Sequence, residues 1–144
     1  MNKIKIYLDT ADINEILKSK TSKIVSGYTT NPSLMKKNNI KEYKHFIKFL
    51  CSKISKPISF EIFADNDNEI YEQAMKISKF SKNIYVKIPI VNSKGKELTK
   101  VIKRLNEKNV KLNITAVFTL EQYKAAYKSC LLYTSDAAYE EDGV

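Results

Sequence analysis

The feature that most constrains the fold of this sequence is a fivefold alternation between short strand-like segments and amphipathic helical segments. Aliphatic residues occupy every second position of the strand-like segments and recur three and four residues apart in the helical ones. Such an alternation is typical of a parallel sheet whose strands are joined by helical crossovers. The predicted strands span residues 4–9, 23–28, 58–63, 83–90 and 110–117.

Start signals support the helices of this alternation. Asp12 and Glu15 have the spacing of a capping box, and so do Thr119 and Gln122. Asn31 suits an N-cap, because the proline that follows it fits the first helical position. The predicted helical segments span residues 12–20, 43–54, 65–81, 98–105 and 119–128, with a further start at 31–32.

The two faces of the predicted strands differ in polarity. One face is aliphatic, whereas the other carries Asp9, Glu61, Lys87 and Thr115 near the C-terminal ends of four strands. Both faces are apolar in an open doubly wound sheet, but one face of a closed β/α barrel points into the barrel. The pattern therefore predicts an α/β fold of the barrel type, with its active site at the C-terminal mouth.

Lys87 stands in the middle of the β-branched, apolar run that ends at Pro89. Burial in such a strand disfavours the charged ammonium, and a neutral amine can form a Schiff base with a carbonyl. A snorkelling lysine or an edge-strand lysine is the structural alternative.

Length and composition exclude several other classes of protein. The 144 residues fit one domain, and a hydrophobic content of 43% indicates a packed core. No apolar run approaches membrane-spanning length, and Cys51, Cys130 and His45 lack the spacing of a disulfide framework or a metal site. No Gly-rich phosphate-binding fingerprint follows a strand. We therefore expect a cytoplasmic protein with no cofactor, no metal and no membrane partner.

The net charge of +9 suggests a lysine-rich nucleic-acid-binding module as a rival interpretation. The lysines, however, are spread along the predicted helix faces between Glu and Asn, and they are not clustered with aromatic residues or glycines. We therefore expect a solvated lysine surface and no nucleic-acid partner. Steeply salt-dependent binding without Schiff-base chemistry would favour the rival.

A closed barrel would bring a set of polar side chains together at one mouth, where a Schiff-base lysine needs carboxylates for proton transfer and amides or hydroxyls to orient a sugar. Each member other than the lysine also has a structural explanation, as a turn residue, an N-cap, a salt-bridge partner or a solvent-facing strand position. The set consists of Asp9, Asn31, Glu61, Lys87, Asn113 and Thr115.

Five segments carry a resemblance to a known family, in family order. They are Tyr7-Leu8-Asp9-Thr10-Ala11-Asp12, Thr29-Thr30-Asn31-Pro32-Ser33-Leu34, Ser59-Phe60-Glu61, Val86-Lys87-Ile88-Pro89 and Asn113-Ile114-Thr115-Ala116-Val117-Phe118. On these segments the chain resembles the transaldolase family, including its fructose-6-phosphate aldolase-like members. The resemblance implies a class I enzyme of carbohydrate metabolism in the pentose phosphate pathway, with sugar phosphates as substrates and a homo-oligomeric full-length form.

The resemblance also implies roles for individual residues. Lys87 would be the Schiff-base lysine and Asp9 the acid–base residue of carbon–carbon bond cleavage, while Glu61 and Thr115 would hold and activate water. Asn31, Asn113 and Thr30 would bind the substrate. Glu61 and Asn113 are similar to transaldolases proper, which favours transfer of a dihydroxyacetone unit over aldol cleavage.

The end of the chain departs from this pattern. Family members have eight strands, so the resemblance implies a partial (β/α)8 TIM barrel in residues 1–129, with five of eight units and without the later strands that bind phosphate. Residues 130–144 resemble a translated sequencing adapter. All 25 basic residues precede Cys130, whereas four of the 16 acidic residues follow it. We expect a fragment with a non-native tail and little activity; a genuine acidic tail is the alternative.

Overall fold

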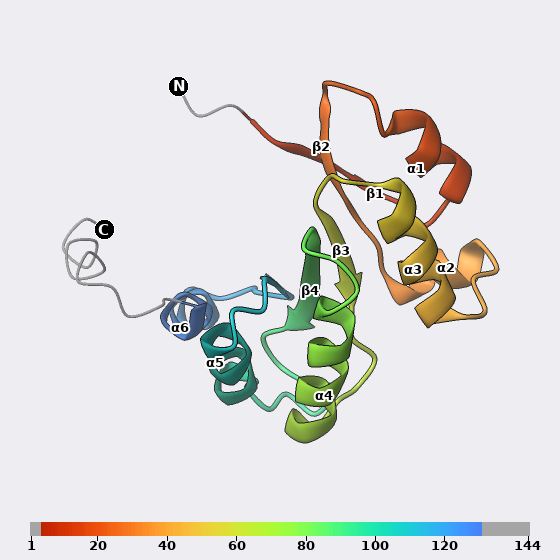
Figure 1. The fold of residues 1–144 in the computed structure, drawn as a ribbon. Coiled ribbons are helices and arrows are strands. Elements are labelled where there is room, and N and C mark those ends of the chain that lie inside the picture. The colour runs from red at the N-terminus through yellow and green to blue at the C-terminus, as the bar shows by residue number, and fades with distance from the viewer. Residues whose placement is uncertain (1–3, 131–144) are drawn as a thin grey trace.

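The computed structural model describes residues 4–130, which form one curled sheet of five parallel strands with helices between them (Figure 1). The strand order follows the chain, so each strand pairs with the next. The strands are β1 (Ile6–Asp9), β2 (Val25–Thr29), β3 (Ile58–Glu61), β4 (Ile84–Pro89) and β5 (Leu112–Thr115). The predicted α/β class and the partial β/α barrel are confirmed.

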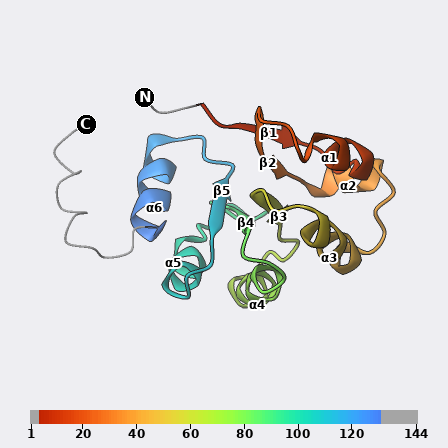
Figure 2. The same cartoon turned by 45° about the horizontal axis from the view of Figure 1, so that its top comes forward.

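The helices lie along the convex outside of this sheet, from α1 at one end to α6 at the other (Figure 2). They are α1 (Ile13–Ser19), α2 (Pro32–Lys37), α3 (Tyr43–Lys53), α4 (Asp67–Ser78), α5 (Thr99–Glu107) and α6 (Leu120–Cys130). The crossover between β2 and β3 holds two helices, because Asn39 takes a left-handed conformation (φ 55°) that ends the first of them. None of these helices is long and apolar enough to cross a lipid bilayer.

Predicted helix starts are found where side chains can accept hydrogen bonds from the first turn. Asp12 accepts from the amides of Asn14 and Glu15, and Asn31 accepts from the amide of Leu34. The capping box of α6 is reciprocal, since Gln122 donates to the Thr119 hydroxyl while its own side-chain oxygen accepts from the Thr119 amide.

Several elements are shorter than the sequence pattern predicts. β3 ends at Glu61 because the amides of Phe63 and Ala64 turn away to the side-chain oxygen of Gln73. α4 ends at Ser78, whose hydroxyl donates back to the Met75 carbonyl. β1, β2 and β5 each begin two residues later than predicted, at Ile6, Val25 and Leu112.

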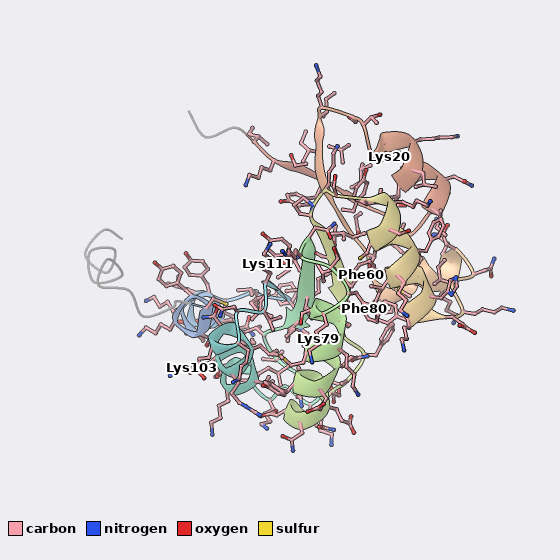
Figure 3. All side chains as sticks on the ribbon, viewed as in Figure 1. Lys20, Phe60, Lys79, Phe80, Lys103 and Lys111 are labelled. Atoms are coloured by element: carbon pink, nitrogen blue, oxygen red, sulfur yellow. The ribbon has the colours of Figure 1, made fainter. Side chains whose placement is uncertain are left out.

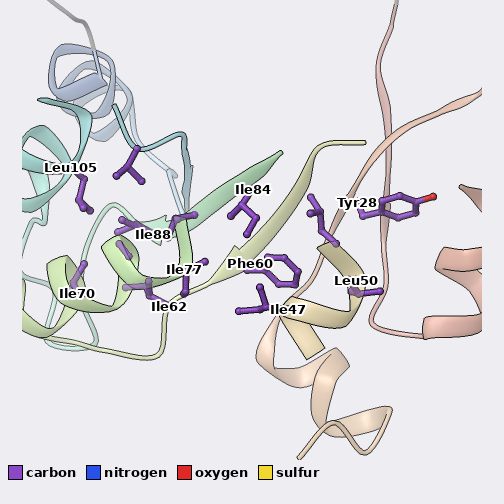
Figure 4. Close-up of a cluster of buried hydrophobic side chains, with 14 of the residues drawn as sticks. Tyr28, Ile47, Leu50, Phe60, Ile62, Ile70, Ile77, Ile84, Ile88 and Leu105 are labelled. Carbon is purple, nitrogen blue, oxygen red and sulfur yellow. The ribbon is translucent and has the colours of Figure 1, made fainter. Parts of the chain in front are cut away.

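The core lies between the aliphatic face of the sheet and the helices. Along β4, Ile84, Val86 and Ile88 are buried, whereas the residues between them are half-buried on the concave face. Figure 4 shows Phe60 of β3 packed near Ile47 of α3, within a cluster that continues through Ile77. The predicted assignment of the aliphatic parity to the helix side is therefore correct for β3 and β4.

The concave face holds a hollow of about 410 Å³. Gly27 of β2 packs beside Tyr7, one of the residues that line this hollow, and a Cβ atom there would lie 2.5 Å from the Pro57 carbonyl oxygen and 2.6 Å from the Tyr7 ring. Glycine thus lets β1 and β2 approach the neighbouring backbone and ring. The residues that line the hollow are Tyr7, Thr29, Ser59, Tyr85, Leu112 and Asn113.

The C-terminal segment of the sequence remains a prediction. Cys130 is the last residue of α6, and residues 131–144 lie outside the described residues. The predicted domain boundary at residues 129/130 and the adapter origin of the tail are therefore neither supported nor opposed by the fold.

Candidate active site

Lys87 occupies the concave face near the C-terminal end of β4. The parallel register pairs it with Glu61 of β3 on one side and with Asn113 of β5 on the other. Parallel strands present their C-terminal ends at the same edge, so these three side chains meet on one face of the sheet. The sequence predicted that these residues lie at one mouth, and in the fold Glu61, Lys87 and Asn113 form one row across three neighbouring strands.

The amine of Lys87 has two polar partners. Its Nζ donates to the Thr30 carbonyl oxygen at 3.0 Å and lies 3.4 Å from Oε2 of Glu61. The Lys87 side chain is 12% exposed and that of Glu61 is 26% exposed. Both groups have lost most of their water, and the Glu61 carboxylate is the charged partner of the Lys87 ammonium. The two side chains therefore form an ion pair near the C-terminal ends of β3 and β4.

A hydrogen-bond network connects the floor of this site. The buried hydroxyl of Thr30 donates to the Ser59 carbonyl at 3.1 Å, and Nδ2 of Asn113 donates to the Ser59 hydroxyl at 3.2 Å. Ser59 also lines the hollow of the concave face, and it pairs with Tyr85, two positions before Lys87 along β4. Thr30, predicted as a substrate contact, thus orients Lys87 through its carbonyl, while its hydroxyl is engaged with protein.

Tyr43 is a site residue that the sequence did not indicate. Its hydroxyl, at the start of α3, donates to the Glu61 carbonyl at 2.6 Å, and its ring packs edge to face against Phe60 and Phe63. These contacts hold the end of β3 from both sides of Glu61. Burial, assisted by the nearby Glu61 charge, raises the pKa of the Tyr43 phenol.

Replacing Tyr43 by phenylalanine should keep the ring contacts and remove the hydrogen bond. We expect a loss of about 1 kcal/mol in the free energy of unfolding at neutral pH, because the Glu61 carbonyl loses its donor. Since the phenol pKa is higher in the folded than in the unfolded chain, the contribution of Tyr43 is full below pH 10 and declines as the pH rises further. Urea unfolding at pH 8 and pH 11 should therefore show a smaller alkaline decline in Tyr43→Phe. An equal decline in the two proteins would contradict this account.

The other predicted site residues lie around this row. Asp9 is exposed at the end of β1, where it pairs with Thr29, and it is three strands away from Lys87 in the sheet. Asn31 caps α2 through its oxygen, which leaves its amide nitrogen without a protein partner among residues 4–130. Thr115 is half-buried and pairs with Pro89, two residues beyond the Asn113 position. Asp9 and Thr115 thus share the edge of Lys87, and neither forms a hydrogen bond or an ion pair with it in the part of the chain that the structure describes.

The described residues do not gather a candidate metal site, since no three His, Cys, Asp or Glu side chains in residues 4–130 could hold an ion together. The charged groups at the mouth are organised as the pair Lys87–Glu61 instead. This arrangement suits covalent chemistry at an amine with an adjacent acid–base group.

Comparison with known proteins assigns the sequence to a family. Residues 6–139 match the family model described as Transaldolase/Fructose-6-phosphate aldolase. The chain belongs to the transaldolase/fructose-6-phosphate aldolase family. The resemblance seen in the five sequence segments is therefore confirmed.

Curated relatives in the transaldolase/fructose-6-phosphate aldolase family agree with this assignment. A "Probable transaldolase" of Dictyoglomus turgidum is 41% identical over 132 residues, which are 92% of this chain and 59% of the relative. One of Dehalococcoides mccartyi is 38% identical over 120 residues, which are 83% and 54% of the two chains. One of Caldicellulosiruptor saccharolyticus is 33% identical over 132 residues, or 92% and 58%. The chain thus spans 54–59% of the length of these relatives.

Proposed function

We propose that a full-length protein containing this chain carries out transaldolase-type transfer of a dihydroxyacetone unit between sugar phosphates, with Lys87 as the nucleophile. The observation that carries the proposal is the Lys87 amine, largely withdrawn from water and 3.4 Å from the Glu61 carboxylate. A desolvated lysine with an acid–base partner at the mouth of a parallel β/α sheet has what imine formation requires.

Imine formation needs a group that accepts the proton of the ammonium and then helps the carbonyl oxygen to leave as water. Glu61 takes a proton from the Lys87 ammonium, and the neutral amine adds to the C2 carbonyl of a ketose phosphate. Glu61 then returns the proton to the carbinolamine hydroxyl, which leaves as water and gives the iminium. Thr115 holds this water for the later hydrolysis. The Nζ–C2 bond forms, and the carbonyl oxygen is released as water.

Bond cleavage needs a second acid–base group, which is Asp9. It accepts the proton of the C4 hydroxyl, the C3–C4 bond breaks, and the electron pair moves into the iminium to give an enamine. An aldose phosphate leaves, and a second one is attacked by the enamine in the reverse sequence. Asn31 and Asn113 orient the sugar for these steps, while Thr30 holds the Lys87 amine through its carbonyl oxygen.

Glu61 and Asn113 favour transfer over aldol cleavage, because the resemblance assigns these residue types to transaldolases proper. The alternative is a fructose-6-phosphate aldolase-like reaction that releases free dihydroxyacetone. Release of dihydroxyacetone at the same rate with and without an aldose phosphate acceptor would favour that alternative. We place the reaction in the pentose phosphate pathway of the cytoplasm, with no coenzyme and with a homo-oligomeric full-length enzyme.

Glu61→Gln and Asp9→Ala should fail at different steps. In single-turnover experiments with fructose 6-phosphate, Glu61→Gln should slow imine formation by about 100-fold or more, because no carboxylate accepts the ammonium proton. Asp9→Ala should form the imine at the normal rate and release the aldehyde about 100-fold or more slowly. Quenching with borohydride reports the first step, and aldehyde release reports the second.

Glu107→Gln is a matched control, because Glu107 ends α5 outside the row of Lys87 and is exposed. It should leave both rates unchanged. Equal defects of the Glu61 and Asp9 variants at both steps would show that the two roles are wrongly assigned.

A further inference from the structure

The loops that lead from helices into strands repeat a short lysine motif. Three of them carry the pattern Ser-Lys-x-Ser-Lys, and the fourth keeps the two lysines at the same spacing. Each motif begins within one residue of the end of a helix and finishes before the next strand. The segments are Ser19-Lys20-Thr21-Ser22-Lys23, Ser52-Lys53-Ile54-Ser55-Lys56, Ser78-Lys79-Phe80-Ser81-Lys82 and Lys108-Asn109-Val110-Lys111.

Hydrogen bonds join each of these loops to the next. Nζ of Lys56 donates to the carbonyls of Ser22 and Val25, which ties the second loop to the first. Asn83 donates to the Ile54 and Lys56 carbonyls, and Lys111 donates to the Lys82 carbonyl. The four loops therefore form one continuous surface at the N-terminal ends of β2 to β5, opposite the mouth that holds Lys87.

This surface, which we call the lysine face, carries concentrated positive charge. Six of its eight lysines are exposed without a hydrogen bond to a neighbouring loop, and none of the eight forms an ion pair within residues 4–130. Figure 3 labels Lys20, Lys79 and Lys111 from three different loops. Glu107 is the acidic residue nearest in sequence, whereas Asp9, Glu61 and Asp65 stand at the opposite ends of the strands. The six exposed lysines are Lys20, Lys23, Lys53, Lys79, Lys82 and Lys108.

Local stability explains part of this pattern. Lysines at helix C-termini stabilise the helix dipole, which accounts for Lys20, Lys53, Lys79 and Lys108. Lys56 and Lys111 serve as hydrogen-bond donors between loops. Lys23 and Lys82 lie beyond the helix ends and have neither role, so helix capping does not account for the whole surface.

We propose that the lysine face binds the phosphate backbone of nucleic acid without reading its sequence. A row of ammonium groups on successive loops matches a polymer with regularly repeated negative charges. The motif lysines are accompanied by serines and by few aromatic residues, so phosphate contact is favoured over base stacking. The lysines are spread along the sequence, which led us to expect no nucleic-acid partner, but the fold gathers eight of them at one end of the sheet.

The test uses the 144-residue chain and a fluorescein-labelled 20-base-pair DNA duplex, followed by fluorescence anisotropy. Non-specific binding of this kind has Kd values of about 10⁻⁴–10⁻⁶ M near physiological salt. If all six exposed lysines contact phosphates, log K should fall against log[NaCl] with a slope of about −5. No measurable binding at 30 mM NaCl would overturn the proposal.

Two variants of equal net charge separate the lysine face from general attraction. K20Q/K53Q/K79Q/K108Q removes four loop lysines, and K41Q/K44Q/K94Q/K100Q removes four exposed lysines elsewhere. The first variant should bind about tenfold or more weakly at 100 mM NaCl, with a slope reduced by about 3 to 4. The second should change the affinity less than threefold. Equal losses in both variants would overturn the proposal.

A footprint of the unmodified protein provides a readout that does not depend on how the variants fold. Lysine acetylation by a soluble reagent, with and without the duplex, should show protection of Lys20, Lys53 and Lys79. Lys41 and Lys94 should react equally in both samples. Protection at the second set, or at neither set, would overturn the proposal.

Discussion

Replacing Lys87 by methionine is expected to abolish covalent trapping of a keto-sugar phosphate. With borohydride and fructose 6-phosphate, the unmodified chain should gain a stable adduct, whereas Lys87→Met should gain none. Methionine keeps most of the length and the unbranched apolar stem of lysine but removes the nitrogen that forms the Nζ–C2 bond. Intact-protein mass spectrometry measures the adduct directly.

Lys96→Met is the matched control for this experiment. Lys96 is also ion-paired, with its Nζ 3.1 Å from the Asp67 carboxylate, but its side chain is 62% exposed. This variant should trap the sugar as well as the unmodified chain does. If Lys87→Met trapped the sugar as well as the unmodified chain does, Lys87 would not be the nucleophile, and its ion pair with Glu61 would have another role.

Phe60→Ala should have the largest effect on stability. Phe60 is fully buried and packs edge to face against Tyr43 and Phe46, so it joins β3 to α3 directly behind the site (Figure 4). Truncating a buried phenylalanine costs about 3–5 kcal/mol. Because whole domains are stable by only about 5–15 kcal/mol, we expect partial unfolding at 25 °C or a midpoint shifted far to lower denaturant concentration.

Phe118→Ala provides the comparison, because the Phe118 side chain is 87% exposed. Its free energy of unfolding should stay within about 0.5 kcal/mol of the unmodified chain. Urea titrations followed by far-ultraviolet circular dichroism measure both variants. Similar unfolding midpoints for the two variants would show that the packing of β3 against α3 contributes little to the stability of this partial barrel.

The sequence predicted the parts of the fold that rest on local periodicity. Alternation along β3 and β4 separated the helix-facing side from the concave side, and this separation put Glu61 and Lys87 on one face. The parallel register then followed from helical crossovers between successive strands. Capping residues such as Asp12 and Asn31 fixed helix starts because their hydrogen bonds span only two or three residues.

The parts that could not be predicted depend on contacts between distant residues or on the backbone. Thr30 reaches Lys87 through a carbonyl oxygen, a group that every residue has, so its identity gave no signal. Tyr43 lies 18 residues before Glu61 in the sequence. In the sequence pattern it is only one more apolar position of an amphipathic helix, so nothing indicates that its hydroxyl contacts Glu61. Gly27 becomes necessary only when the Tyr7 ring and the Pro57 carbonyl are in place.

The most direct test of the central claim is to locate the trapped sugar in the unmodified chain. After borohydride reduction with fructose 6-phosphate, peptide mapping by tandem mass spectrometry should place the adduct on Lys87 and leave the many exposed lysines unmodified. An adduct on another lysine, or none on Lys87 in a chain that melts cooperatively, would contradict the account.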